Sequence, residues 1–69
     1  MEEKELDLRF TYHAPKEGQP EKYTKIRSSA GILAAIINDA CPESREKSLA
    51  FTALEEAVMW ANASIARRA

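Results

Sequence analysis

The chain has 69 residues, 45% of them hydrophobic and 30% charged, and its formal net charge of −1 excludes a broad electrostatic footprint for duplex DNA. A chain of this length supports one domain and buries only about 60% of its unfolded surface, so we expect oligomerisation to supply further stability. The single Cys41 and the single His13 exclude an internal disulfide and a one-chain zinc site, and no apolar run approaches the ~20 residues of a membrane span.

Apolar and polar side chains alternate in the first segment, where the apolar set is Leu6, Leu8, Phe10 and Tyr12. A period of two predicts an extended arm with one buried face. Because no second strand pattern exists, the arm either pairs with another subunit or lies over the helices as an extended or single-turn segment. The loop at residues 13–20 holds two of the three prolines and ends the arm.

The first long helix is predicted from residue 20 to residue 40. Pro20 and Glu21 suit its first turn, and its apolar stripe consists of Tyr23, Ile26, Ala30, Leu33, Ile37 and Cys41. Gly31 in mid-helix costs about 1 kcal/mol relative to Ala, which indicates either close approach by a neighbour or ligand, or a tolerated glycine. Pro42 disfavours helical geometry at Cys41 and ends the helix.

The second long helix is predicted from residue 44 to residue 68, with Ser44 as its N-cap and with Arg67 and Arg68 in its last turn. One heptad-like seam runs along it, at Phe51, Leu54, Val58, Ala61 and Ile65. With its flanking residues, the apolar arc covers roughly 200°, against the ~100° that one surface helix needs. One partner helix would therefore leave part of this arc exposed.

These elements predict an all-α fold, in which two long helices form an antiparallel hairpin with an extended or short-helical N-terminal arm. The chain is expected to be a single helical domain over residues 1–69, with the arm and loop at 1–19 and the helices at 20–40 and 44–68. The excess apolar arc favours assembly as a symmetric oligomer. The charged N-terminal sequence predicts no secretion signal.

Side chains that could perform catalysis are scarce. Glu55 and Glu56 are adjacent, so on a helix they diverge and mark a solvated face, and His13 has no nucleophile or acid beside it in sequence. We therefore expect no enzyme activity, no cofactor and no metal. Tyr12 with Arg27 or Lys25 is more informative, because an aromatic face and a cation are what a nucleotide's base and phosphate require.

Four segments of the sequence match a known pattern. They are F-x-Y-H-x-P at 10–15, Y-x-x-I-R at 23–27, C-P-x-S-R-E-K-S-L-A at 41–50 and L-E-E-A-V-M-W-A-N-A at 54–63. With these segments the chain resembles the small phage anti-CBASS sponge proteins, relatives of the sponges that oppose the Thoeris defence.

The resemblance implies a non-catalytic phage protein that sequesters cyclic oligonucleotides in the host bacterial cytoplasm and so blocks CBASS effectors. Expected partners are cyclic GMP-AMP, cyclic tri-adenylate and further copies of the chain, with no DNA and no membrane. The family's fold is a helical hairpin with an N-terminal arm, assembled as a hexamer of interlocked dimers.

The resemblance also implies two kinds of pocket. Cyclic dinucleotides would lie between subunits, with Tyr12 stacked on a base and with Arg27, or alternatively Lys25, at a phosphate. Cyclic trinucleotides would lie in separate pockets on the symmetry axis, and the polar groups there would correspond to His13, Ser29 and Arg68.

Two hypotheses from other classes stand beside sequestration. A phosphodiesterase would turn the ligand over, although the sequence offers neither a metal cluster nor an acid–base pair for this reaction. A structural helical adaptor would present the apolar arc to a host protein, and in isolation it would be monomeric, sticky or poorly folded.

Overall fold

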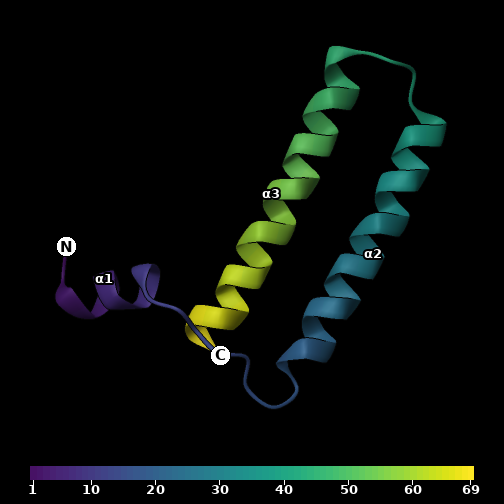
Figure 1. Ribbon diagram of the computed structural model, residues 1–69. Helices are drawn as coiled ribbons and strands as arrows, with labels where there is room; N and C mark the ends of the chain where they lie inside the picture. The colour runs from purple at the N-terminus through teal and green to yellow at the C-terminus, as the bar shows by residue number, and fades with distance from the viewer.

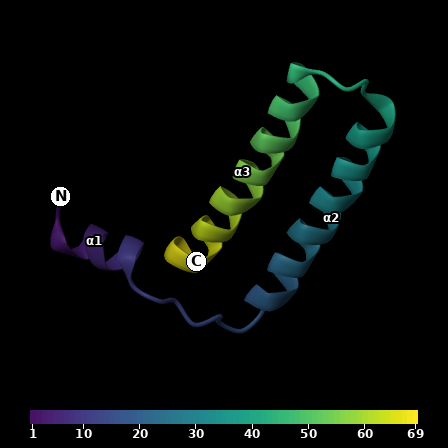
Figure 2. The same cartoon turned by 45° about the horizontal axis from the view of Figure 1, so that its top comes forward.

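The computed structural model describes all 69 residues and contains three helices and no strand: α1 (Glu3–Phe10), α2 (Gln19–Ala40) and α3 (Arg45–Arg68). Helices α2 and α3 run side by side as an antiparallel hairpin, and α1 lies beside the C-terminal end of α3, on the side away from α2 (Figures 1 and 2). The molecule measures 45 × 29 × 13 Å, so the hairpin forms a single layer of helices. None of the three helices is both long enough and apolar enough to cross a membrane.

The all-helical fold and the hairpin are confirmed, and local signals explain where the helices begin and end. Gly18 precedes α2 with φ of 82°, a left-handed conformation that glycine adopts without strain, and Pro20 lies in the first turn. Helix α2 ends at Ala40, and Cys41 after it is extended (φ −101°, ψ 133°) before Pro42. Ser44 caps α3, because its hydroxyl accepts a hydrogen bond from the Lys47 backbone N–H at 3.1 Å.

The extended conformation predicted for the arm is wrong, and the short-helical alternative is correct. Residues Glu3–Phe10 form α1, with acidic side chains in the first turn and Arg9 in the last turn. Glu5 and Arg9 pair at i and i+4, with 2.7 Å between Oε2 and Nε. The alternating pattern is ambiguous, because Leu6 and Phe10 are also four residues apart, and this spacing defines one face of a helix as well as one face of a strand.

The hairpin has an apolar seam but no apolar residue that is fully buried. The predicted seam residues of α3 are all half-buried, and they are Phe51, Leu54, Val58, Ala61 and Ile65. Large apolar side chains away from the seam stay exposed, among them Ile32, Ile36, Leu49, Met59 and Trp60. The apolar arc of the single chain is therefore wider than the hairpin covers, as the sequence indicates.

Polar side chains close both ends of the hairpin. At the open end, Gln19 is only 5% exposed, and its amide donates to the Ile65 carbonyl at 3.2 Å. At the connection between the helices, Lys47 is only 6% exposed, and its Nζ donates to the Asn38 carbonyl at 3.1 Å and to Glu43 Oε1 at 2.7 Å. These bonds join α2 to α3 at both ends of the seam.

Candidate ligand-binding site

Two grooves lie between α2 and α3, on opposite faces of the hairpin. The first, the Arg27 groove, has a volume of about 460 Å³ and is lined from α2 by Arg27, Ala30, Gly31 and Ala34. The second, the Ser29 groove, has a volume of about 400 Å³ and includes Lys25 and Ser29. Successive helical residues are about 100° apart, so Arg27 and Lys25 flank the α2 stripe on opposite sides. Both volumes are in the range of small-molecule sites, about 300–1,000 Å³.

Gly31 lies in the open Arg27 groove. A Cβ atom built at Gly31 would meet no other group within 4 Å. The close neighbour that the sequence suggested is therefore not present within the single chain. Any group that needs the space above Gly31 would have to come from outside this chain.

The proposed dinucleotide residues are not gathered by one chain. Tyr12 follows α1 and is 86% exposed, and it is not among the residues that line the Arg27 groove. Lys25 and Arg27 serve different grooves, so they are alternatives on different faces rather than two cations of one site. The structure thus presents an aromatic face and a cation, each on a separate surface.

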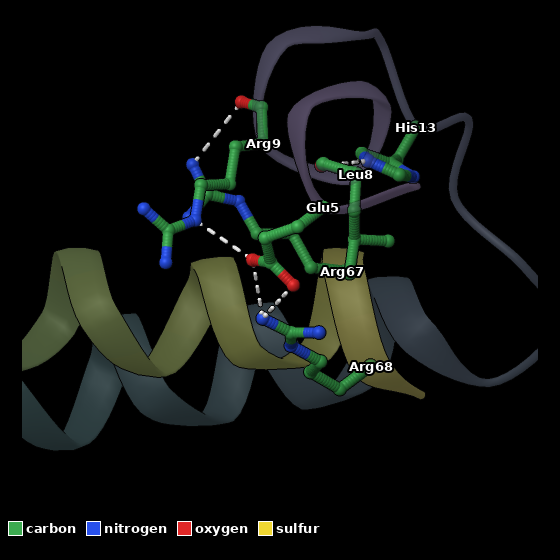
Figure 3. A network of polar contacts seen from close by, with 6 residues as sticks. All are labelled: Glu5, Leu8, Arg9, His13, Arg67 and Arg68. Atoms are coloured by element: carbon green, nitrogen blue, oxygen red, sulfur yellow. Dashed lines mark hydrogen bonds and ion pairs between the residues drawn. The ribbon is translucent and has the colours of Figure 1, made fainter. Parts of the chain in front are cut away.

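His13 is half-buried and is used within the arm. Its Nε2 lies 2.7 Å from the Leu8 carbonyl oxygen, so Nε2 carries a hydrogen that it donates there (Figure 3). The Thr11 hydroxyl likewise donates to the Asp7 carbonyl. The Asp7 carbonyl also accepts the Thr11 backbone N–H, whereas the Leu8 carbonyl lies in the last turn of α1, where helical N–H donors run out, and takes its hydrogen bond from His13.

Arg68 joins the arm to α3. Its Nη2 lies 2.9 Å from Glu5 Oε2 and 3.3 Å from Glu5 Oε1, and the same carboxylate accepts a hydrogen bond from Arg9 Nε (Figure 3). Arg67 Nη2 donates to the Arg9 carbonyl at 3.4 Å. Hydrogen bonds from Arg68 and then from Arg9 lower the pKa of the Glu5 carboxyl below its ordinary value.

A third groove, the arm groove, lies between α1 and α3 and has a volume of about 500 Å³. It is lined by Arg9, Phe10, Trp60, Ala63, Ser64, Arg67 and Arg68. Ser29 lines a different groove, on the α2 side of α3, so one chain does not bring Ser29 and Arg68 together. The arm groove is the most cationic of the three.

Comparison with protein families assigns the fold. A family model described as Acb2/Tad1, hairpin domain, matches residues 2–66. The chain belongs to the Acb2/Tad1 hairpin family. This is the family of anti-CBASS and anti-Thoeris sponges, which sequester cyclic oligonucleotides, and it is not known as an enzyme family. Comparison with curated proteins and with solved structures gives no match.

In this Acb2/Tad1 chain, the sequence analysis missed Arg9 and Trp60 as residues that line a groove, and it missed Glu5 as the ion-pair partner of Arg9 and Arg68. Arg67 and Arg68 were assigned only to the helix dipole or to a pocket on the symmetry axis, because nothing in the sequence places α1 against the end of α3. The i, i+4 spacing of Glu5 and Arg9 was an available signal for a helical arm. The structure contains no group of three or more His, Cys, Asp or Glu side chains that could hold a metal ion.

Proposed function

We propose that this chain sequesters cyclic oligonucleotide second messengers intact and so blocks the activation of CBASS effectors in a phage-infected bacterial cell. The observation that carries the proposal is the match of the Acb2/Tad1 hairpin model to residues 2–66. The cyclic dinucleotide ligands are of the cyclic GMP-AMP kind, and the cyclic trinucleotide ligands are of the cyclic tri-adenylate kind.

The dinucleotide site uses Tyr12 and Arg27 from different subunits. The exposed ring of Tyr12 supports this assignment, because both of its faces are available for stacking on a base. Arg27 beside the open Arg27 groove supplies a guanidinium group for a phosphate. A two-fold interface would supply one Tyr12 and one Arg27 to each half of the ligand, which matches the ligand's own pseudo-symmetry. Lys25 is the alternative cation and would place the ligand on the opposite face.

The trinucleotide site uses His13, Ser29 and Arg68, gathered from several subunits around a symmetry axis. Ser29 lines an open groove and Arg68 is exposed, so both side chains remain accessible in the single chain. His13 keeps Nδ1 for a ligand while Nε2 holds the arm. The exposed apolar side chains outside the arm groove, such as Ile32, Ile36 and Leu49, support a homo-oligomer, of which a hexamer is the proposed form.

The second candidate function is a helical adaptor for a host protein. The observation that favours it is the same exposed apolar surface, which a partner protein could cover instead of another copy. A monomeric, aggregation-prone protein that releases no nucleotide would support this reading. A phosphodiesterase has no supporting observation in the structure.

The test is ligand recovery. The purified protein is incubated with a panel of cyclic di- and trinucleotides, free ligand is removed, the protein is heat-denatured, and the released material is chromatographed. Intact cyclic nucleotide is the expected result. Recovery of linear products would show that the protein hydrolyses the ligand and is a phosphodiesterase. Recovery of no nucleotide from any ligand would favour the helical adaptor.

Replacing the arm's tyrosine tests the proposed dinucleotide site. Tyr12→Ala is expected to weaken dinucleotide binding by about 1–3 kcal/mol for each stacked base, whereas Tyr12→Phe keeps the stacking face and most of the affinity. Both variants are measured by calorimetric titration with cyclic GMP-AMP. Equal affinity of wild type and Tyr12→Ala would remove Tyr12 from the site and leave sequestration itself untouched.

A further inference from the structure

The arm groove concentrates positive charge on a chain whose net charge is −1. Three guanidinium groups line it, from Arg9, Arg67 and Arg68, together with two aromatic side chains. Phe10 is 79% exposed and Trp60 is 66% exposed, so both rings offer accessible faces. A volume of about 500 Å³ suits a ligand the size of a nucleotide.

Glu5 places a carboxylate against two of these arginines. Its Oε2 lies 2.7 Å from Arg9 Nε and 2.9 Å from Arg68 Nη2, and its Oε1 lies 3.3 Å from the same Arg68 nitrogen (Figure 3). Carboxylate and phosphate oxygens are both acceptors for the planar guanidinium fork. An anion from the chain itself therefore bridges two cations of the groove.

We propose that the arm groove binds a phosphate group of a nucleotide-like ligand and that Glu5 is the internal competitor for this position. The phosphate lies between Arg9 and Arg68, Arg67 supplies further positive charge, and the base lies beside Phe10 or Trp60. This inference deepens the proposed function and rests on it for the assignment of Arg68 to a nucleotide site. The roles of Glu5, Arg9 and Arg67 follow from the geometry of the arm.

The competitor can be displaced at low cost. Ion pairs that stay in contact with solvent are weak, and this one joins the exposed Arg68 to the half-buried Glu5, whose side chain is 27% accessible. Helix α1 has eight residues, fewer than the ~12–15 that an isolated helix needs in water, so it stays ordered through its contacts. A ligand that adds stacking to its phosphate contacts gains an interaction that Glu5 lacks.

The test compares two variants that each remove one negative charge from α1. Glu5→Gln removes the bridging carboxylate, and Glu3→Gln is its matched control, because Glu3 lies on the same exposed helix and makes no ion pair. The probe is inorganic pyrophosphate, titrated by calorimetry at low ionic strength. Glu5→Gln is expected to bind it about fivefold more tightly than wild type, and Glu3→Gln within about twofold of wild type. An equal increase in pyrophosphate affinity in both variants would show that only the net charge matters, and would overturn the proposal. No increase in affinity in Glu5→Gln would also overturn it.

A second comparison separates competition from simple loosening of the arm. Amide hydrogen exchange of α1 is followed in the same samples, and the double variant Glu5→Gln/Arg68→Gln is titrated alongside. The gain of Glu5→Gln is expected to disappear in the double variant. Faster exchange of α1 with unchanged pyrophosphate affinity would show that Glu5 only anchors the arm, and would overturn the proposal.

These outcomes are independent of the ligand-recovery experiment. Intact cyclic nucleotide from wild type with no difference between Glu5→Gln and Glu3→Gln would overturn this inference and leave sequestration standing. Tighter pyrophosphate binding by Glu5→Gln without recovery of any cyclic nucleotide would support the arm groove as a phosphate site and count against the proposed function.

Discussion

Helix α3 makes two contacts of opposite character. Toward α2 it presents a half-buried apolar seam that is closed at its ends by the buried side chains of Gln19 and Lys47. Toward α1 it presents Arg67, Arg68 and the exposed ring of Trp60. The arm is held there by one solvent-accessible ion pair, Arg68–Glu5, and by a hydrogen bond from Arg67 to the Arg9 carbonyl. Apolar burial responds weakly to salt and acid, whereas exposed ion pairs respond to both. The hairpin is therefore the scaffold, and the arm is the part that solution conditions or a ligand can move.

The largest expected effect comes from placing a charge in the seam. Val58→Asp puts a carboxylate where α2 and α3 meet, and we expect it to destabilise the fold by about 2–4 kcal/mol, because a partly buried, unpaired charge is costly. Met59→Asp is the matched control, since it adds the same group at an adjacent position that is exposed. Thermal unfolding followed by circular dichroism measures both variants. Equal losses would show that the seam is no more protected than the outer surface.

A smaller effect is expected at the connection between the helices. Lys47→Met keeps most of the apolar stem but removes the bonds to the Asn38 carbonyl and to Glu43, and we expect a loss of about 1–2 kcal/mol. Lys22→Met, an exposed lysine of α2, serves as the control and should change stability by less than about 0.5 kcal/mol. Urea denaturation at low and high salt separates the causes. A loss that vanishes at high salt would show that the ion pair with Glu43 contributes more to stability than the bond to the Asn38 carbonyl.

The sequence predicted the scaffold well because its signals are local. Ser44 as N-cap, Pro20 in a first turn and Pro42 after a last turn each act within one helical turn, and the structure confirms each of them. The seam of α3 was predictable because a helical period repeats over its whole length. The family resemblance drawn from the four matching segments is also confirmed.

The arm was less predictable because its conformation depends on a contact far away in sequence. The eight residues of α1 fit either an alternating or a helical pattern, and the choice is supported by Glu5 pairing with Arg68, 63 residues later. No spacing pattern in the sequence indicates that Glu5 and Arg68 form a pair. The predicted ligand residues stay predictions for a similar reason: Tyr12 and Arg27 do not meet in one chain, so their site would require surfaces from more than one copy.

The smallest expected effect is a pH dependence that separates the α1–α3 contact from the α2–α3 contact. The pKa of Glu5 is lowered in the fold, mainly by the hydrogen bond from Arg68 and then by that from Arg9. Its contribution to arm docking is therefore complete above the carboxyl's unfolded pKa and is lost as pH falls through the lowered folded pKa. Hydrogen exchange of α1 amides, normalised to the intrinsic rate at each pH, should stay constant near neutrality and rise sharply in acid, while α2 and α3 remain protected. Glu5→Gln has no carboxyl group to titrate at this position, so its arm should show no acid transition, and an unchanged transition in that variant would assign it to another carboxyl group.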